Sequence, residues 1–400
     1  MAALSGNIKK LYLIKIAKWF MLTMPILMLF YHDLGFTVEE SFQLKAIYSI
    51  AIVLFEIPSG YAADVLGRRR TLIFGSIMGT VGFAIYSFYS GFYAFLAAEL
   101  ILGVGQSFIS GADSAMLYDS LKAQNRQKDY LKLEGRNFSV GNFSEAIAGF
   151  AGGALAEISL RMPFYFQTGI AFIAIPAAIL LVEPQVYTRT RKATWKDIFE
   201  VVKYAMVKNK SLRYNIIYSS IIGSATLTMA WIFPLYLAEI NFSEIHIGAT
   251  STMLNLIVGM TTLAAYKIEQ RLAPKFTIWG FTLVITGAFI AAGFLHSIYV
   301  LPVLMIFYFS RGIATPVLKD YINRITSSEM RATVLSIRSL IIRANFSILA
   351  PLFGYMTDRL SLSQAFMIIG GIFMILTGSC IILFLRSLER QKKSEQSALI

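Results

Sequence analysis

The 400-residue sequence contains little cysteine and little charge. Its single cysteine, Cys380, excludes a disulfide framework and any metal site that needs several cysteines. Charged residues make up 15% of the chain and hydrophobic residues 56%, with a mean hydropathy of +0.63. A soluble domain of this length cannot bury so much apolar surface, so we expect lipid to surround a large part of the chain.

Several patterns of catalysis and targeting are also absent. The sequence has no phosphate-binding glycine loop, no nucleophile elbow and no zinc-ligand spacing. We therefore predict that the protein is not an enzyme and holds no metal or organic cofactor. The first apolar run continues past Phe30 without a small-residue cleavage site, which argues against a cleavable signal peptide. The net charge of +13 is spread over many short turns, a distribution that disfavours a nucleic-acid partner.

Long apolar segments dominate the chain, and twelve of them are long enough to cross about 30 Å of hydrocarbon. Backbone amides in lipid need internal partners, and no two-residue alternation is present, so we predict helices rather than barrel strands. The fold class is therefore an all-α integral membrane protein. The predicted spans are 11–31, 43–63, 71–90, 93–117, 137–157, 163–183, 213–238, 247–266, 276–296, 298–318, 333–356 and 363–385.

The positive charges are distributed unevenly between the two sides of these spans. If the N-terminus lies in the cytoplasm, almost all of the 36 Lys and Arg residues fall on the inner side. The exceptions are Lys45, Arg161 and Arg359 on the outer side, and Arg311 and Arg343 within spans. Because cytoplasmic loops carry the excess of Lys and Arg, both termini are predicted to be cytoplasmic.

The spans form two sets of six. We predict an N-terminal bundle over 1–183, a cytoplasmic linker over 184–212, a C-terminal bundle over 213–386 and a cytoplasmic tail over 387–400. The two bundles resemble a diverged repeat, because short matches recur in one common order. The linker carries apolar residues at helical spacing, which predicts either an amphipathic helix on the inner membrane surface or a solvated tether. These residues are Trp195, Ile198, Phe199, Val202 and Met206.

A short charged turn joins the second and third spans, with the sequence GYAADVLGRRR at residues 60–70. It resembles the loop signature G-x-x-x-D-x-x-G-R-R of the major facilitator superfamily. The matching positions are Gly60, Asp64, Gly67, Arg68 and either Arg69 or Arg70. The resemblance implies two six-helix bundles around a central cavity that open alternately to each side, and a loop that latches the halves on the inner side. Positive-inside topology is the alternative explanation of the arginines.

Carboxylates inside the predicted spans are candidates for proton coupling, because burial raises the pKa of a carboxyl group. The fourth span carries Glu99, Gln106, Ser110 and Asp113 along one predicted helical face. The resemblance implies that this helix lines the central cavity. Glu99 or Asp113 is therefore predicted to be the coupling acid, with a structural ion pair as the alternative. Two further embedded candidates are Glu56 and Glu145, for which pairing with Arg136 or with the arginine turn is the alternative.

Cations and aromatic residues in the second half are candidates for a substrate cavity. Tyr308, Arg311 and Thr315 share one predicted helical face, so Arg311 could meet an anionic group of a substrate. Arg343 has the same chemistry, and Trp231 could contact an amphiphilic molecule. Residues 144–153 loosely resemble the antiporter motif G-x-x-x-G-P-x-x-G-G of drug and proton exchangers. Close helix packing by small residues is the alternative interpretation of that segment.

These features predict a secondary transporter in the bacterial inner membrane, driven by a proton gradient and active as a monomer. The first hypothesis is proton-coupled export of a small amphiphilic or drug-like compound. The second is a proton-coupled importer or exchanger of an organic anion, which depends on Arg311 and Arg343. A membrane receptor or sensor without flux is the hypothesis from another class.

Overall fold

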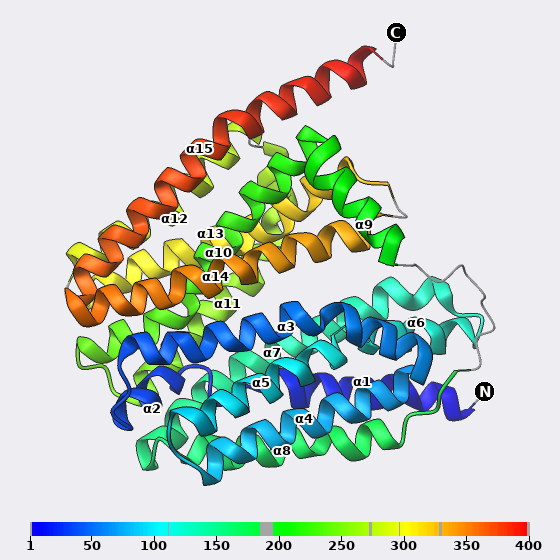
Figure 1. Cartoon of the computed structure of the whole chain (residues 1–400), viewed down its shortest axis with the longest axis horizontal. Helices are drawn as coiled ribbons and strands as arrows, with labels where there is room; N and C mark the ends of the chain where they lie inside the picture. The colour runs from blue at the N-terminus through cyan, green and yellow to red at the C-terminus, as the bar shows by residue number, and fades with distance from the viewer. Residues whose placement is uncertain are drawn as a thin grey trace. The chain divides into compact units, whose positions relative to one another are not determined.

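The computed structural model describes residues 2–110, 112–184, 195–271, 274–295, 297–327 and 330–397. Every regular element in these residues is a helix (Figure 1). In chain order the elements are α1 (Ala2–Trp19), α2 (Leu27–Asp33), α3 (Val38–Leu66), α4 (Arg68–Phe88), α5 (Phe92–Ile109), α6 (Ala112–Lys122), η1 (Gln127–Asp129), α7 (Tyr130–Ile158), α8 (Met162–Ile179), α9 (Trp195–Lys203), η2 (Tyr204–Lys208), α10 (Lys210–Glu239), α11 (Glu244–Arg271), α12 (Pro274–Phe294), α13 (Val300–Arg324), α14 (Arg331–Arg359) and α15 (Leu362–Ser397).

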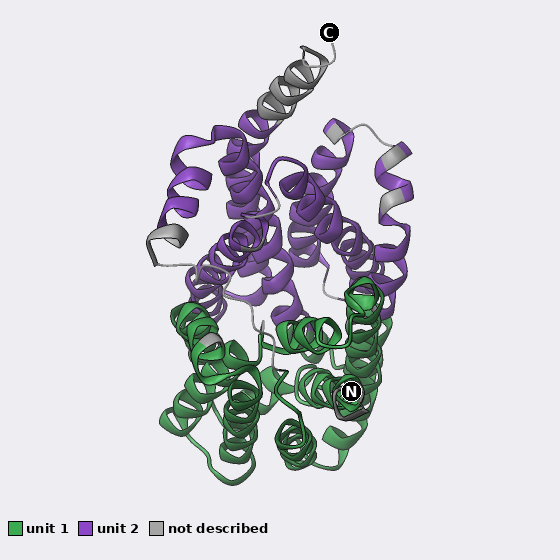
Figure 2. Cartoon of the chain, turned by 90° about the vertical axis from the view of Figure 1, so that its right-hand side faces the viewer, with its two compact units in different colours: residues 1–188, 234–255 green, residues 189–233, 256–400 purple. Residues whose placement is uncertain are grey.

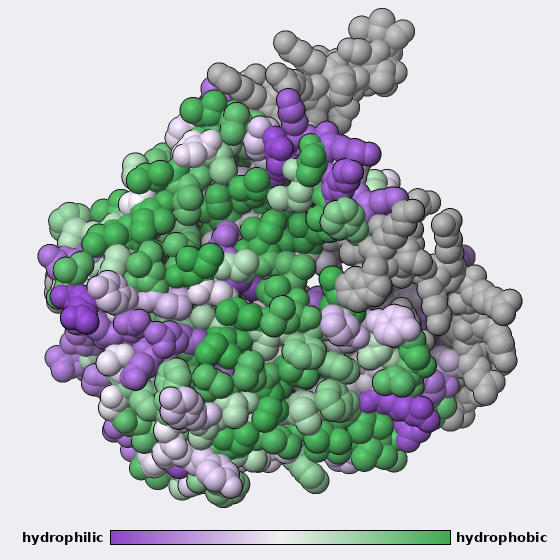
Figure 3. Space-filling view, in the orientation of Figure 1, coloured by the Kyte–Doolittle hydropathy of each residue, from purple (hydrophilic) through white to green (hydrophobic). Residues whose placement is uncertain are grey.

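Ten segments of the described chain are long and apolar enough to cross a membrane, and they correspond to ten of the predicted spans. Large apolar side chains are exposed on them, for example Leu263 and Phe276, and hydrophobic residues cover much of the face in Figure 3. Such a surface requires lipid as its solvent. The other two predicted spans are helical but differ in form. A turn that contains Pro25 divides 11–31 into α1 and α2, and polar residues such as Asn142 lower the hydropathy of α7.

The predicted fourth span is interrupted. Helix α5 ends at Ile109, and Ser110 adopts extended backbone angles of φ −60° and ψ 127° before α6 begins at Ala112. Ser has weaker helix propensity than Ala or Leu, which favours an interruption at Ser110. The prediction of one continuous polar face from Glu99 to Asp113 is therefore wrong. Glu99 and Gln106 lie on α5, whereas Asp113 lies on α6.

The chain divides into two compact units (Figure 2). Unit 1 comprises residues 1–188 and 234–255, and unit 2 comprises residues 189–233 and 256–400. The end of α10 and the beginning of α11 therefore belong to unit 1, although both lie in the predicted C-terminal bundle.

Packing in unit 1 follows from apolar residues and small residues on its helices. Leu11 and Ile14 of α1 form one buried cluster with Leu72 of α4 and Met116 of α6. Helices α4 and α5 approach closely at glycines, because a Cβ at Gly75 would lie only 2.9 Å from the carbonyl oxygen of Gly105. These contacts hold the helices that carry the buried charges of unit 1.

The predicted linker helix packs on unit 2. Val202 of α9 and Met206 of η2 lie against a buried cluster that includes Leu212 of α10 and Val334 of α14. Phe199 points to the exposed side, and the side chains of Trp195 and Ile198 lie outside the described residues. Val202 and Met206 are covered by protein, whereas Phe199 is exposed. A location of this helix on the inner membrane surface stays a prediction. The partner on α14 comes from a distant part of the chain, so periodicity alone could not identify it.

Candidate functional site

Glu99 forms the most deeply buried charged site of unit 1. Its side chain is 0% exposed as part of α5. The Lys45 ammonium of α3 lies 2.6 Å from Glu99 Oε1. The same oxygen accepts hydrogen bonds from the hydroxyls of Tyr86, at 2.5 Å, and Tyr31, at 3.1 Å. Three donors thus converge on one carboxylate oxygen.

Aromatic side chains enclose this ion pair. Tyr86 stacks on Phe95 at 4.6 Å and on Phe164 at 5.3 Å between ring centroids. Lys45 is itself buried, and the count of outer-side cations in the sequence did not reveal its partner. The reason is that counting charges by chain position places a residue along a span but does not detect a partner on another helix. The pairing is the structural alternative that the sequence offered for Glu99.

Asp113 forms a second, more open site at the beginning of α6. Its Oδ2 lies 3.5 Å from the Lys15 ammonium of α1, and its Oδ1 accepts a hydrogen bond from the Ser114 backbone N–H at 2.7 Å. The Lys15 ammonium also lies 5.2 Å from the ring centroid of Trp19. Asp113 is 6% exposed. Sequence reasoning placed Lys15 among the inner-side cations and missed its role as the partner of this acid.

A third acid extends the polar cluster around Asp113 toward α7. The Ser114 hydroxyl donates a 2.7 Å hydrogen bond to Glu134 Oε1. Glu134 Oε2 and Asn137 Oδ1 are buried and accept no hydrogen bond within the described part of the chain. Buried acceptors without partners are costly, so each of these two oxygens could still accept a hydrogen bond. Glu134 is a residue that sequence reasoning missed, because it lies before the predicted fifth span.

The other two acids predicted for proton coupling are half-buried. The backbone carbonyl of Glu56 accepts a hydrogen bond from the Ser59 hydroxyl at 3.0 Å. Glu145 lies on α7, where the suggested partner Arg136 is exposed. Arg136 forms no ion pair with any residue that the structure describes, so a Glu145–Arg136 pair is not part of this fold. On the described segment of α5, Gln106 is half-buried, and Ser110 is exposed just beyond its end.

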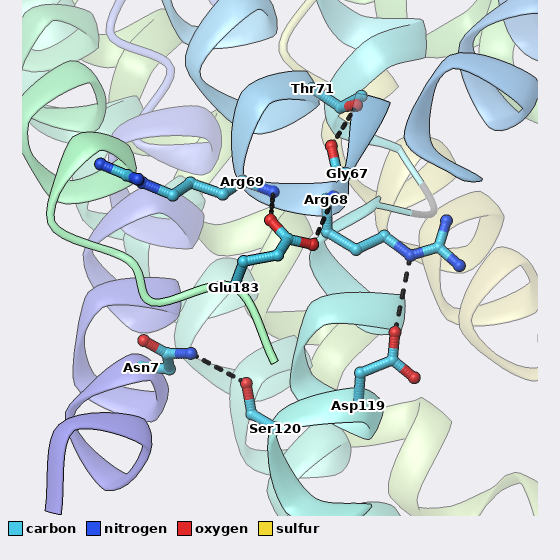
Figure 4. A network of polar contacts seen from close by, with 8 residues as sticks. All are labelled: Asn7, Gly67, Arg68, Arg69, Thr71, Asp119, Ser120 and Glu183. Atoms are coloured by element: carbon cyan, nitrogen blue, oxygen red, sulfur yellow. Dashed lines mark hydrogen bonds and ion pairs between the residues drawn. The ribbon is translucent and has the colours of Figure 1, made fainter. Parts of the chain in front are cut away.

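The charged turn at residues 60–70 is built into a network inside unit 1 (Figure 4). The Glu183 carboxylate accepts hydrogen bonds from the backbone N–H groups of Arg68, at 2.8 Å, and Arg69, at 2.7 Å. These N–H groups are the unpaired donors at the beginning of α4, where an anion is favoured. The Arg68 guanidinium also lies 3.6 Å from Asp119 of α6. Glu183 was missed by sequence reasoning, because its partners lie more than a hundred residues earlier.

The end of α8 is held by the same network. The Arg69 guanidinium donates hydrogen bonds of 2.6 and 3.1 Å to the carbonyl oxygen of Ile179. The Asn7 amide donates to Ser120 Oγ at 2.9 Å and to the Val182 carbonyl at 2.8 Å, and the Ser120 contact is visible in Figure 4. The turn therefore links α1, α4, α6 and the segment after α8 within unit 1.

The individual residues of the predicted latch differ in what they contribute. Gly67 has φ +96°, a conformation that only glycine adopts readily, so its place in the motif has a backbone reason. Gly60 faces open space, and Arg70 is exposed. The side chain of Asp64 lies outside the described residues. A latch between the two halves remains a prediction.

The predicted substrate residues of unit 2 lie on α10, α13 and α14. The Arg311 guanidinium lies 5.3 Å from the ring centroid of the buried Tyr308, and the Thr315 hydroxyl donates to the Arg311 carbonyl at 3.1 Å. Tyr308 is buried whereas Thr315 is exposed, so a shared substrate-facing role of these three residues stays a prediction. Arg343 and Trp231 are both half-buried. Neither Arg311 nor Arg343 forms an ion pair among the described residues.

The small residues at 144–153 serve close helix packing within unit 1. A Cβ at Gly153 would lie 2.5 Å from the Glu244 carbonyl oxygen of α11, and a Cβ at Gly248 would lie 2.5 Å from the Gly149 carbonyl oxygen. The Thr252 hydroxyl donates a 2.6 Å hydrogen bond to the Ala146 carbonyl. These contacts match the packing interpretation of the antiporter-like segment.

Apolar helices of membrane-crossing length, with ionisable side chains paired in their interior, define an integral membrane protein of the transporter type. The chain belongs to the Major Facilitator Superfamily, whose family model matches residues 11–344. The resemblance seen in the turn at residues 60–70 is thereby confirmed, together with the all-helical membrane fold.

Relatives in other organisms agree with this assignment. An uncharacterized MFS-type transporter of Methanocaldococcus jannaschii is 21% identical over 367 residues, which cover 90% of this chain and 92% of that protein. The quinolone resistance protein NorA of Staphylococcus aureus is 23% identical over 205 residues, which cover 48% of this chain and 51% of NorA.

Two solved structures share the fold. The nucleoside transporter NupG superimposes with a TM-score of 0.79 at 13% identity, over 96% of this chain and 99% of NupG. A bacterial homolog of the human lysosomal transporter Spinster gives a TM-score of 0.78 at 14% identity, over 97% of this chain and 98% of that chain. At such low identity these similarities establish the fold alone.

Proposed function

We propose that the protein exports a small amphiphilic, drug-like compound in exchange for protons, by alternating access of one binding site to the two sides of the membrane. The observation that carries the proposal is the buried pair of Asp113 and Lys15. An ionisable pair inside a membrane transporter marks an ion or proton pathway by default. The relative NorA is named a quinolone resistance protein, which supports export of drug-like compounds.

Asp113 fits the role of the coupling acid better than Glu99. Its ion pair is longer, at 3.5 Å, and it lies at an interruption between two helices with some exposure. The Glu99 side chain is fully buried. Its Oε1 lies 2.6 Å from the Lys45 ammonium and accepts hydrogen bonds from two tyrosine hydroxyls. The other oxygen, Oε2, has no hydrogen-bond partner among the described residues but is buried as well, so a proton reaches neither oxygen from solvent without a structural change. We therefore assign proton carriage to Asp113 and a structural role to Glu99.

Protonation of Asp113 would remove its negative charge and leave Lys15 without a partner. A conformational equilibrium shifts only when a ligand, here the proton, has different affinities for the two states. The proposal therefore requires that the Asp113–Lys15 pair differs between the inward-open and outward-open states. Glu134 is a second acid close to the pair, because Ser114 donates its backbone N–H to Asp113 and its hydroxyl to Glu134.

The proposal includes an orientation and a compartment. Both termini lie in the cytoplasm, as the distribution of Lys and Arg predicts, and the protein acts as a monomer in the bacterial inner membrane. The proton gradient supplies the energy, and no organic cofactor or catalysis is involved. Gly60, Asp64, Gly67 and Arg68 contribute to a latch between the halves on the cytoplasmic side.

Transport in proteoliposomes tests this function. The purified protein is reconstituted with its orientation determined, and a pH gradient is imposed in the presence of a fluorescent fluoroquinolone. We expect gradient-driven accumulation on the acidic side, abolished by an uncoupler and absent from empty liposomes. Equal fluorescence in protein-containing and empty liposomes, across neutral, cationic and anionic amphiphiles, would reject export of drug-like compounds.

Import or exchange of an organic anion is the second candidate function. It is favoured by Arg311, which forms no ion pair among the described residues and lies over the Tyr308 ring. Under this alternative, Arg311→Gln abolishes uptake of organic acids, whereas Arg271→Gln at the exposed end of α11 leaves it unchanged. Undiminished uptake by the Arg311 variant would exclude this role for Arg311.

A further inference from the structure

A buried arginine in unit 2 has no acidic partner. Arg338 of α14 is only 5% exposed. Its Nε donates a 2.5 Å hydrogen bond to the Ser219 hydroxyl of α10, and its backbone carbonyl accepts a hydrogen bond from Ser220. Its two terminal nitrogens find no acceptor, and the guanidinium forms no ion pair, within the residues that the structure describes. The sequence places Arg338 among the inner-side cations and on another side of its helix from Arg343, so at most one of these two arginines was expected to face a cavity.

The contacts of Arg338 orient its guanidinium. Ser219 holds the Nε edge, and one terminal nitrogen passes Gly223, lying 3.6 Å from where a Cβ at that glycine would stand. A guanidinium fixed along one edge presents its remaining N–H groups as a planar fork. This geometry matches the two oxygens of a carboxylate or phosphate.

A second cation lies within electrostatic reach of Arg338. It is Lys319 of α13, whose ammonium has the same sign of charge. Lys319 is exposed and also forms no ion pair in the described part of the chain. Two acids, Asp320 of α13 and Glu269 of α11, already form ion pairs with Arg324, at 2.6 Å and 3.7 Å.

A buried cation without a counter-charge is unfavourable in a protein interior. Arg338 would therefore gain stability when an anion binds to its remaining N–H groups, with the exposed Lys319 at the edge. The Ser219 hydroxyl adds a polar group next to the fork. The arrangement therefore has the chemistry of an anion-binding site, with a buried fork and an exposed ammonium at its edge.

We propose that Arg338 and Lys319, supported by Ser219, bind an acidic group of the transported amphiphile, such as a carboxylate. This proposal rests on the transport function proposed above and narrows it to substrates that carry an acidic group on an apolar body. The site is distinct from Arg311, which lies on α13 two turns before Lys319 and contacts Tyr308.

Equilibrium binding tests the proposal without requiring flux. The full-length protein in phosphatidylcholine nanodiscs is titrated with 11-(dansylamino)undecanoic acid and with its neutral primary amide, and dansyl fluorescence is recorded. We expect the acid to bind at least ten times more tightly than the amide. Arg338→Gln and, separately, Lys319→Gln should reduce this preference to less than threefold while the affinity for the amide stays the same. The control Arg271→Gln should keep the full preference.

Three results would overturn the assignment. The first is equal affinity of the wild type for acid and amide, and the second is an unchanged preference in both Arg338→Gln and Lys319→Gln. The third concerns lipid: if nanodiscs with phosphatidylglycerol abolish the preference for the acid, the anion at this site is a headgroup rather than a substrate. Lys319→Gln alters an exposed side chain, so it keeps the test valid if the Arg338 variant misfolds.

The binding experiment and the transport experiment test the anion site and the export function independently. Acid-selective binding that depends on Arg338, in a protein without flux, would retain the anion site and reject export. Gradient-driven flux of amphiphiles with no acid preference would retain export and reject the anion site.

Discussion

Glu99 and Lys45 form an ion pair of 2.6 Å between α5 and α3, and both side chains are almost completely buried. Two tyrosine hydroxyls donate to the oxygen that Lys45 contacts. A buried pair is not a strong source of stability in itself, but removal of one partner leaves an uncompensated charge. The pair is therefore expected to keep α3 and α5 together whatever the substrate is.

Lys45→Met should destabilise unit 1 by about 3 to 5 kcal/mol, because it leaves Glu99 charged without a cation. The double variant Lys45→Met/Glu99→Gln should recover most of this loss. Chemical denaturation in detergent measures both. As a control, Arg126→Gln breaks an exposed pair with Asp129 and should cost less than about 1 kcal/mol. If Lys45→Met is as stable as the control, the buried pair does not hold these helices.

Gly248→Ala should destabilise the protein by about 1 to 3 kcal/mol, because the new methyl group would lie 2.5 Å from the Gly149 carbonyl oxygen. The same helix offers a matched control. At Gly259 a Cβ meets nothing within 4 Å, so Gly259→Ala should be neutral or gain up to about 1 kcal/mol from helix propensity. Thermal unfolding in detergent compares the two, and equal shifts would contradict the close packing of α7 and α11.

Glu183→Ala should cost about 1 to 2 kcal/mol, because the first N–H groups of α4 lose their acceptor and the helix dipole loses a favourable anion. Glu200→Ala, on the exposed side of α9, is the control and should change stability little. Denaturation of the two variants gives the comparison. A loss in Glu183→Ala no larger than in the control would show that the cap is not needed.

The helical membrane fold was predictable from the sequence because hydropathy, segment length and the turn at residues 60–70 are local properties. Pairings between distant helices were not predictable. Lys45 was counted as an outer-side charge, although its partner lies on α5, and Glu183 caps a helix that begins more than a hundred residues before it.

The interruption at Ser110 had only a weak local signal. It changed the geometry of the site, because a continuous helix would place Glu99 and Asp113 on one face. Arg338 is another residue whose environment could not be predicted from its position in the chain. Its chain position suggests an inner-side charge, and only the fold shows it buried against Ser219 without an acid.

Asp113 as the coupling acid is the central claim, and the measurement that tests it most directly is gradient-driven accumulation in proteoliposomes. Asp113→Asn should still exchange substrate down its concentration gradient, but a pH gradient should no longer drive accumulation above equilibrium. Glu99→Gln and the exposed control Asp129→Asn should retain accumulation. If Asp113→Asn accumulates substrate to the wild-type level under the same pH gradient, Asp113 does not couple protons to transport and the account is contradicted.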